Sequence, residues 1–263
     1  MITVLGSSGF VGSHLVELLA RSGQRFQAVA RGAELPTDSL GHVIYCIGVT
    51  GDFRARPLDA ANAHVCVLLD VLSRSSFDSF LYLSSVRVYA GARGPAREDD
   101  DLTLNPLRSE DIYNASKALG ESIVLSLGAK GKVARPANVY GVGQSDTFIA
   151  EVVDEATTRG TITFRSPPES SRDFVAVDDV ARLLVDIALR GRERIYNVAS
   201  GINTTNAELG ALIARETGCR IGYAADLVPS PVPSIDVSRI RDEFGFNPAA
   251  LGEQLPLLLG TRR

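Results

Sequence analysis

The stretch ITVLGSSGFVG, residues 2–12, decides the fold. An apolar run at residues 2–5 is followed by glycines at positions 6, 9 and 12, and a segment with helical periodicity follows at residues 11–20. A strand, a tight glycine turn and a helix whose N-terminus offers free N–H groups can bind a pyrophosphate. A glycine-rich turn without a ligand has the same spacing, but its place between the first strand and the first helix favours a dinucleotide site. The predicted contacts are Gly6, Ser8, Gly9, Phe10, Val11 and Gly12.

The rest of the chain alternates short apolar runs with helical patterns. This alternation predicts an α/β fold with a doubly wound, Rossmann-like parallel sheet, and the nearly wholly apolar strands fit a sheet covered on both faces. Shorter segments near the C-terminus are separated by loops such as RSPPESSR (165–172) and VPSPVPS (228–234). We therefore predict a dinucleotide-binding domain at residues 1–141 and 175–199. Residues 142–174 and 200–263 are predicted to form a smaller substrate lobe.

Composition excludes several classes of protein. The chain has 263 residues, 45% hydrophobic and 22% charged, with a net charge of -4, and no basic run suggests a nucleic-acid surface. Its three cysteines show no CxxC spacing, so neither a zinc site nor a disulfide framework is indicated. The sequence opens without the pattern of a signal peptide and has no apolar segment of membrane-spanning length. We expect a cytoplasmic protein with no metal and no membrane partner.

The end of the second strand bears on the choice of cofactor. NAD sites usually place an acidic residue about twenty residues after the glycines, whereas arginine suits the 2′-phosphate of NADP. Here the strand ends in AVARG (28–32), and Arg31 takes the place of the acid. We therefore predict NADP in preference to NAD, although Arg31 could equally be an exposed side chain that lies over the adenine or in solvent.

A second site is indicated by Tyr113 and Lys117, which are four residues apart on a predicted helix. Their side chains therefore share one face. A neighbouring ammonium favours the phenolate and lowers the pKa of tyrosine, so we expect Lys117 to acidify Tyr113. Lysine offers a compact charge that could serve both the phenolate and a ribose hydroxyl.

Ser84 and Ser85 follow an apolar strand, where the carboxyl edge of a parallel sheet forms the ligand crevice. A hydroxyl there can share a proton with a substrate oxygen and with Tyr113. A single serine after a strand is more often an ordinary loop residue, but its occurrence with the glycine turn and the Tyr/Lys pair favours a catalytic role.

Taken together, these motifs resemble the extended short-chain dehydrogenase/reductase family, which includes nucleotide-sugar epimerases and dehydratases. The resemblance spans most of the chain. It is carried by GSSGFVG (6–12), YLSSVRVYAG (82–91), YNASK (113–117), RPANVYG (135–141), SRDFVAVDDVA (171–181), YNVASG (196–201) and DVSRIRDEFGFNP (236–248).

The resemblance implies roles for individual residues. Tyr113 would donate or accept the proton, Lys117 would hold the nicotinamide ribose, and Ser85 would contact the substrate. Asn138 matches a substrate-side asparagine, and Arg172 matches a residue that faces the diphosphate of a nucleotide sugar, although it could instead form a salt bridge within its own segment. Further cofactor contacts are implied at Ile47, Gly48 and Asn62.

Two departures from the family pattern limit this reading. Only eleven residues separate Arg31 from the strand at Val43, so one βα unit is shortened and we expect about six strands in the sheet. The Asp-Glu pair of the 4,6-dehydratases is replaced by Val86 and Arg87, which disfavours dehydration.

The resulting hypothesis is an NAD(P)-dependent enzyme that transfers hydride at a secondary alcohol or ketone, most plausibly C4 of a nucleotide-linked sugar. Epimerisation and 4-keto reduction both remain open. The alternative is a non-catalytic NAD(P)-sensing module of the same fold. A homodimer through the helices at 58–72 and 112–127 is also expected, unless their apolar stripes pack only on the chain's own sheet.

Overall fold

The computed structural model describes residues 1–34, 39–49, 51, 53–92, 94–109, 111–145, 147–225 and 232–260. A six-stranded, fully parallel sheet forms its centre, with the order β2-β1-β3-β4-β5-β9. This confirms the predicted Rossmann-like sheet. Its strands are β1 (Ile2–Leu5), β2 (Phe26–Val29), β3 (His42–Tyr45), β4 (Ser79–Leu83), β5 (Gly131–Pro136) and β9 (Ile195–Val198).

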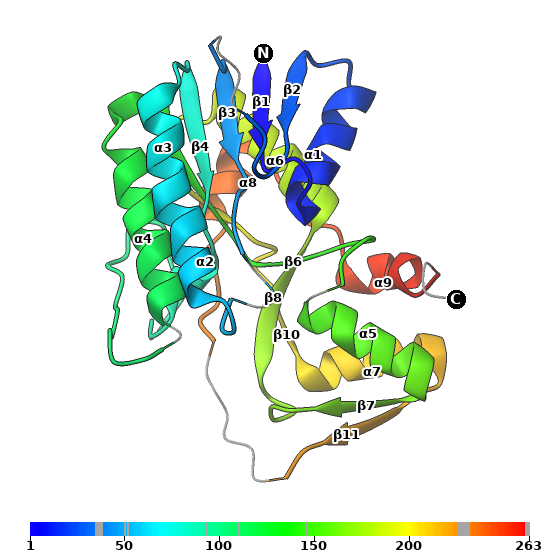
Figure 1. Ribbon diagram of the computed structural model, residues 1–263. Helices are drawn as coiled ribbons and strands as arrows, with labels where there is room; N and C mark the ends of the chain where they lie inside the picture. Colours follow the sequence, from blue (N-terminus) through cyan, green and yellow to red (C-terminus); the bar gives the residue numbers. More distant parts are fainter. Residues whose placement is uncertain are drawn as a thin grey trace.

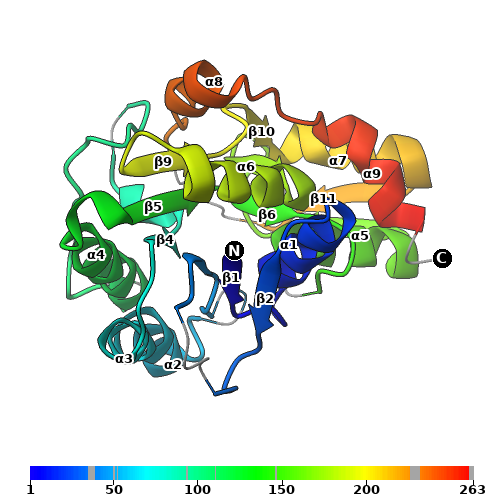
Figure 2. The ribbon, with the colours of Figure 1, turned by 90° about the horizontal axis from the view of Figure 1, so that it is seen from above.

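Helices cover both faces of this sheet (Figures 1 and 2). On one face α1 (Phe10–Arg21) packs with α6 (Val177–Arg190), and on the other lie α3 (Val67–Arg74) and α4 (Asp111–Leu125). Alternate strand residues serve the two faces, since Ile44 packs with the first pair and Tyr45 with the second. Short elements complete this part: α2 (Pro57–Ala61), a π-helical turn (Asn62–Cys66), and 3₁₀ turns at Val86–Tyr89 and Gly128–Lys130.

The connection between β2 and β3 is short, as predicted. Its described residues, 30–34 and 39–41, contain neither helix nor strand. β3 pairs directly with β1, and β2 ends the sheet. The missing βα unit therefore shortens the sheet at this edge.

A smaller lobe lies below the carboxyl edge of the sheet (Figure 1). It has its own apolar core, which includes Phe164, Leu209, Ile213 and Leu255. Helix α7 (Asn206–Thr217) begins with a capping box between Thr205 and Glu208. The strands are β6 (Asn138–Tyr140), β8 (Ser171–Ala176) and β10 (Asn203–Thr205) in one sheet, with β7 (Thr161–Phe164) and β11 (Arg220–Tyr223) in another; the helices are α5 (Phe148–Arg159), α7 (Asn206–Thr217) and α9 (Leu251–Gly260).

The final helices go to different places. Helix α8 (Ser238–Phe244) packs against β9, and Val237 and Ile240 belong to the core of the large sheet. This differs from the sequence prediction, which places all of residues 200–263 in the smaller lobe. Helix α9 packs with α5 and α7 in the smaller lobe. None of the helices in the described part of the chain has the length and apolar character needed to cross a bilayer.

Candidate active site

The glycine turn between β1 and α1 is as tight as its sequence suggests. Gly6 has φ +84°, a conformation that favours glycine, and its carbonyl accepts the Gly9 N–H at 3.0 Å. A Cβ on Gly12 would lie 2.2 Å from the Gly6 carbonyl oxygen, so only glycine fits. Helix α1 follows with Gly9 as its N-cap, and no side chain among the described residues caps it. This cradle fits a pyrophosphate, which the helix N-terminus would attract.

The ends of β1, β2 and β3 bring three further predicted cofactor residues together. A Cβ on Gly6 would lie 3.0 Å from the Ile47 nitrogen, so the glycine turn adjoins the residues that follow β3. Arg31, after β2, is exposed and donates from Nη2 to the Gly48 carbonyl at 2.6 Å. The glycine turn, Ile47, Gly48 and Arg31 therefore form one continuous strip along the carboxyl edge of the sheet.

The two serines after β4 have different surroundings. Ser84 is buried and donates to Glu121 Oε1 at 2.5 Å. Ser85 is partly exposed, accepts the Arg87 N–H at 3.2 Å, and is one of the groups that lower the pKa of Tyr113. Ser85 is therefore the serine placed to share a proton with the phenol.

Tyr113 is buried against two aromatic rings and an arginine. Its side chain is 3% exposed, and its ring centroid is 4.5 Å from that of Phe53 and 5.1 Å from that of His64. The Arg87 guanidinium carbon is 5.8 Å from the centre of the Tyr113 ring. Burial raises the pKa of Tyr113, and the charge of Arg87 and the hydrogen bond with Ser85 oppose this rise. In the sequence, Arg87 stands out only because it and Val86 replace the Asp-Glu pair of the 4,6-dehydratases. Its position beside Tyr113 is not evident there.

Lys117 differs from its expected role. It is 4% exposed and donates from Nζ to the Leu83 carbonyl at 2.7 Å. Burial lowers the pKa of Lys117 to about 7, while the charges of Glu121 and Cys46 oppose that change. The cation that lowers the pKa of Tyr113 in this structure is Arg87. The expectation that Lys117 lowers the pKa of Tyr113 therefore needs correction. The Lys117 ammonium is directed to the backbone of β4, and burial favours the neutral form of Lys117.

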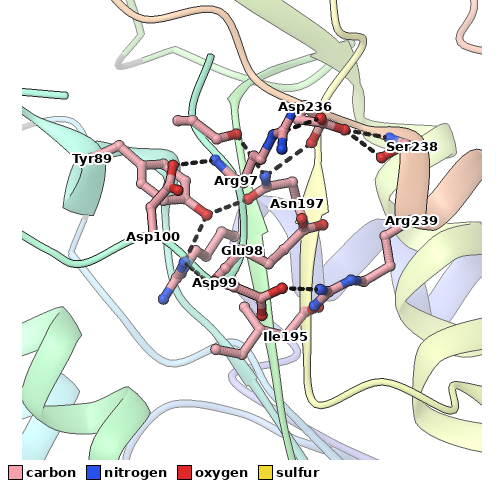
Figure 3. A network of polar contacts seen from close by, with 12 residues as sticks. Tyr89, Arg97, Glu98, Asp99, Asp100, Ile195, Asn197, Asp236, Ser238 and Arg239 are labelled. Carbon is pink, nitrogen blue, oxygen red and sulfur yellow. Dashed lines mark hydrogen bonds and ion pairs between the residues drawn. The ribbon is translucent and has the colours of Figure 1, made fainter. Parts of the chain in front are cut away.

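A buried polar network supports the helix that carries Tyr113 and Lys117. Arg135 on β5 donates to both oxygens of Glu121, at 3.0 and 2.6 Å, and to the Tyr89 hydroxyl at 2.6 Å. Tyr89 in turn donates to Asn197 Oδ1 at 2.7 Å, and the Asn197 N–H donates to Glu98 Oε1 at 2.9 Å (Figure 3). Glu121 thus joins α4 to Arg135 on β5 and to Ser84 after β4. Separating α4 from the sheet would leave a buried charge unpaired, so this network fixes the helix in place.

Two polar residues of the π-helical turn before α3 differ in their exposure to solvent. Asn62, the predicted nicotinamide contact, is exposed. Two residues later, His64 is fully buried, and its Nδ1 lies 2.9 Å from Ser116 Oγ. The structure thus joins His64, and not Asn62, to the helix of Tyr113 and Lys117. Sequence reasoning missed His64; the available signal was a histidine in an apolar helical segment.

Two of the predicted substrate residues, Asn138 and Arg172, lie in the smaller lobe. Asn138, at the start of β6, is exposed and donates to the Asp173 carbonyl at 2.9 Å. Arg172 on β8 donates to Asn206 Oδ1 at 3.2 Å, and its guanidinium lies 3.8 Å from the centre of the Phe148 ring. Burial lowers the pKa of Arg172. Its contacts in this structure are thus an amide and an aromatic ring, and not the salt bridge considered as the alternative.

Two cavities lie outside the strip described above. The larger, of about 640 Å³, is lined by residues that include Gly141, Ser145, Ile149 and Leu258, between the end of β6 and the helices α5 and α9. The smaller, of about 480 Å³, lies over the network of Figure 3 and is lined mainly by charged residues. Neither lining includes a predicted site residue. We locate the chemistry from the converging side chains, because these carry the reactive groups.

Comparison with known proteins agrees with the geometry. Residues 37–199 match the NAD dependent epimerase/dehydratase family. A putative UDP-glucose 4-epimerase of Methanocaldococcus jannaschii is 25% identical over 84% of this chain and 83% of its own length. The structure of MoeE5 in complex with UDP-glucose and NAD is 25% identical, with a TM-score of 0.82 over 100% of this chain and 98% of that one. RMD from Pseudomonas aeruginosa complexed with NADPH has the same fold, with 24% identity, a TM-score of 0.82, and coverage of 98% and 97%.

Proposed function

Because the chain belongs to the NAD dependent epimerase/dehydratase family and is an NAD(P)-dependent enzyme of the extended short-chain dehydrogenase/reductase type, we propose that it transfers hydride at C4 of a nucleotide-linked sugar. The outcome would be epimerisation or reduction of a 4-keto sugar. The observation that carries this proposal is the convergence of Ser85, Tyr113 and Lys117 at the carboxyl edge of the sheet, beside Gly48 and the glycine turn.

The chain's own residues handle the proton in this proposal. The bound dinucleotide accepts or supplies the hydride. Tyr113 removes the proton of the C4 hydroxyl as the C–H bond is oxidised, and returns it when the ketone is reduced. Ser85 holds the sugar oxygen and Tyr113 in one hydrogen-bonded line. Arg87 would stabilise the phenolate that forms while Tyr113 lacks its proton.

We do not propose 4,6-dehydration. Loss of water needs a group that takes one proton and another that donates one, and the family's dehydratases use an Asp-Glu pair for this step. Val86 has no ionisable group, and Arg87 remains protonated. Arg87 also lies over the Phe53 ring at 4.7 Å, so a cation occupies the place where an acid would be required.

The smaller lobe would bind the nucleotide part of the substrate. Arg172 can present a planar pair of donors to a diphosphate, and Phe148 keeps that guanidinium in place from one side. Asn138 lies on β6, which pairs with β8, and is opposite Phe174 in that pairing. Relatives support this class of substrate: the solved structures of MoeE5 contain UDP-glucose or UDP-glucuronic acid.

For the cofactor we propose NADP in preference to NAD. Arg31 is exposed at the end of β2, and its bond to the Gly48 carbonyl holds the guanidinium beside the predicted strip. A cation at that position would stabilise a 2′-phosphate. Titration of Arg31→Ala with NADPH and with NADH tests this proposal, and we expect loss of affinity for NADPH alone.

The function itself is tested with a panel of substrates. Purified protein is incubated with nucleotide hexoses and nucleotide hexuronic acids, and with their 4-keto forms plus NADPH or NADH, and products are identified by NMR and mass spectrometry. We expect C4-inverted or C4-reduced nucleotide sugars. A 4-keto-6-deoxy product would contradict the exclusion of dehydration. Dinucleotide binding without turnover of any sugar would favour the non-catalytic sensing module.

We also propose a homodimer through α3 and α4. Large apolar side chains are exposed on or beside these helices, among them Leu58, Leu69 and Leu119. Light scattering of the wild-type protein and of Leu69→Lys/Leu119→Lys tests this, with a monomer expected for the double variant.

A further inference from the structure

The buried imidazole of His64 lies against Tyr113, with 5.1 Å between the ring centroids, and the proposed chemistry does not use it. His64 has no exposed surface, and its Nε2 has no hydrogen-bond partner among the described residues. It belongs to the π-helical turn Asn62–Cys66, and turns of this type often occur at functional sites. A buried acceptor or donor without a partner is costly in free energy, so its retention calls for an explanation.

Neighbouring hydrogen bonds determine which nitrogen of His64 carries the proton. The Ser116 hydroxyl donates its single hydrogen to the Tyr113 carbonyl at 2.9 Å. Ser116 Oγ is therefore the acceptor in its 2.9 Å contact with His64, and Nδ1 is the donor. Burial, and then the charge of Lys117, lower the pKa of His64 to about 2, so the ring is neutral. Nε2 consequently presents a lone pair.

Gly48 defines the place toward which this lone pair is directed. A Cβ built on Gly48 would lie 3.5 Å from His64 Nε2 and 3.7 Å from Lys117 Nζ. The two nitrogens thus approach one point above Gly48, which is free of side-chain atoms because residue 48 is glycine. One nitrogen is an acceptor, and the other is a donor.

We infer that His64 Nε2 accepts a hydrogen bond from the nicotinamide-ribose hydroxyl that Lys117 binds, and so is a cofactor-binding residue. A hydroxyl group matches this pair because it accepts from the lysine through its lone pairs and donates its hydrogen to the imidazole. An ether oxygen could not donate to Nε2, and an ammonium could not accept from Lys117. The inference rests on the proposed use of a dinucleotide at this site and does not depend on which sugar is turned over.

The test compares two ligands that differ in the second ribose. NADH and NADPH contain the nicotinamide ribose, whereas ADP ends at the diphosphate. His64→Phe keeps a ring against Tyr113 and removes Nε2. We expect the dissociation constant for the reduced dinucleotide, from fluorescence titration, to rise about threefold to tenfold, the range for one neutral hydrogen bond. The dissociation constant for ADP, from calorimetry, should stay unchanged.

A matched control is available at the other end of β3. His42 also has its Nδ1 2.9 Å from a serine hydroxyl, that of Ser79, but it lies at the amino end of the strand. His42→Phe should change neither dissociation constant. Gly48→Ala provides a second test that leaves His64 intact: the added methyl group occupies the meeting point and should weaken binding of the dinucleotide but not of ADP.

Two results would overturn the inference. One is unchanged dinucleotide affinity in both His64→Phe and Gly48→Ala. The other is an equal loss of affinity for the dinucleotide and for ADP, which would mean that the substitutions distort the whole crevice. Neither result would bear on the sugar reaction, which the substrate panel tests separately, and lack of sugar turnover would leave these binding measurements valid.

Discussion

At the carboxyl edge of the large sheet, the side chains of Tyr113, Lys117 and His64 are almost completely buried, whereas in the smaller lobe Asn138 is exposed and Arg172 is partly exposed. The first group is held by contacts between β4, α4 and the π-helical turn. In the second group, Arg172 is held by an amide and an aromatic ring, and Asn138 donates to a backbone carbonyl. The difference suggests that the reacting groups are preorganised, while the substrate-binding side can adapt to its ligand.

The strongest challenge to this comparison is to remove, from the buried side, the hydroxyl that we propose transfers the proton. Tyr113→Phe keeps the ring and its contact with Phe53, so the fold should be retained. We expect turnover to fall by ~10²- to 10⁴-fold, the usual contribution of general acid–base catalysis. Cofactor affinity should stay within a few-fold. Steady-state kinetics and dinucleotide titration measure the two effects, and unchanged turnover would remove Tyr113 from the mechanism.

On the adaptable side, Arg172→Ala should act on substrate binding. Loss of a charged hydrogen-bond donor to a diphosphate is expected to raise KM about tenfold to a hundredfold while changing kcat little. Arg165→Ala, an exposed arginine after β7, makes the same charge change in the same lobe and serves as the control. If kcat and not KM falls, Arg172 acts on the chemical step, and the division between the two regions is wrong.

The burial of Lys117 predicts a dependence of stability on pH. The pKa of Lys117 is lowered to about 7 in the folded protein, so between pH 7 and 10 the unfolded chain binds a proton that the folded chain does not. Stability relative to Lys117→Met should therefore rise with pH in this window, by at most ~1.4 kcal/mol per pH unit, and level off below pH 7. Urea unfolding of both proteins at pH 7 and pH 9 measures this difference.

Lys130 offers a control for that experiment. It is exposed in the 3₁₀ turn before β5, so Lys130→Met makes the same substitution at a lysine that is not buried. A stability difference that does not change with pH for Lys117→Met would show that its ammonium remains charged in the folded protein.

The smallest expected effect concerns Arg87, which lies in the 3₁₀ turn after Ser85 and approaches the ring of Tyr113. Arg87→Gln removes the charge that lowers the pKa of Tyr113, so the pH at which turnover rises should move upward. Arg54→Gln is the matched variant, because Arg54 also lies 4.7 Å from the Phe53 ring centre. Its pH profile should match that of the wild type. Equal shifts in both variants would assign the effect to Phe53 packing.

Local pattern was sufficient for most of the fold and part of the site. Apolar runs and glycines locate β1, α1 and the cofactor turn, and the short segment after Arg31 correctly predicts the shortened sheet. Spacing along a helix also correctly puts Tyr113 and Lys117 on one helix, α4. These features depend on neighbours within a few turns of chain, which is the range that periodicity reports.

Contacts between distant segments could not be predicted in this way. His64 meets Ser116 across 52 residues, and it lies in the π-helical turn, where the helical register changes. Whether Lys117 or Arg87 acts on Tyr113 depends on where each long side chain is directed after burial. The packing of α8 on β9 likewise follows from tertiary contacts that sequence order does not reveal.

The shortened connection after β2 also affects how the protein behaves at high concentration. As the terminal strand of its sheet, β2 presents an outer row of backbone groups that another chain could extend. With only four residues, Phe26–Val29, it offers a poor template for such pairing. Grafting a longer strand onto this edge would therefore risk aggregation through β2.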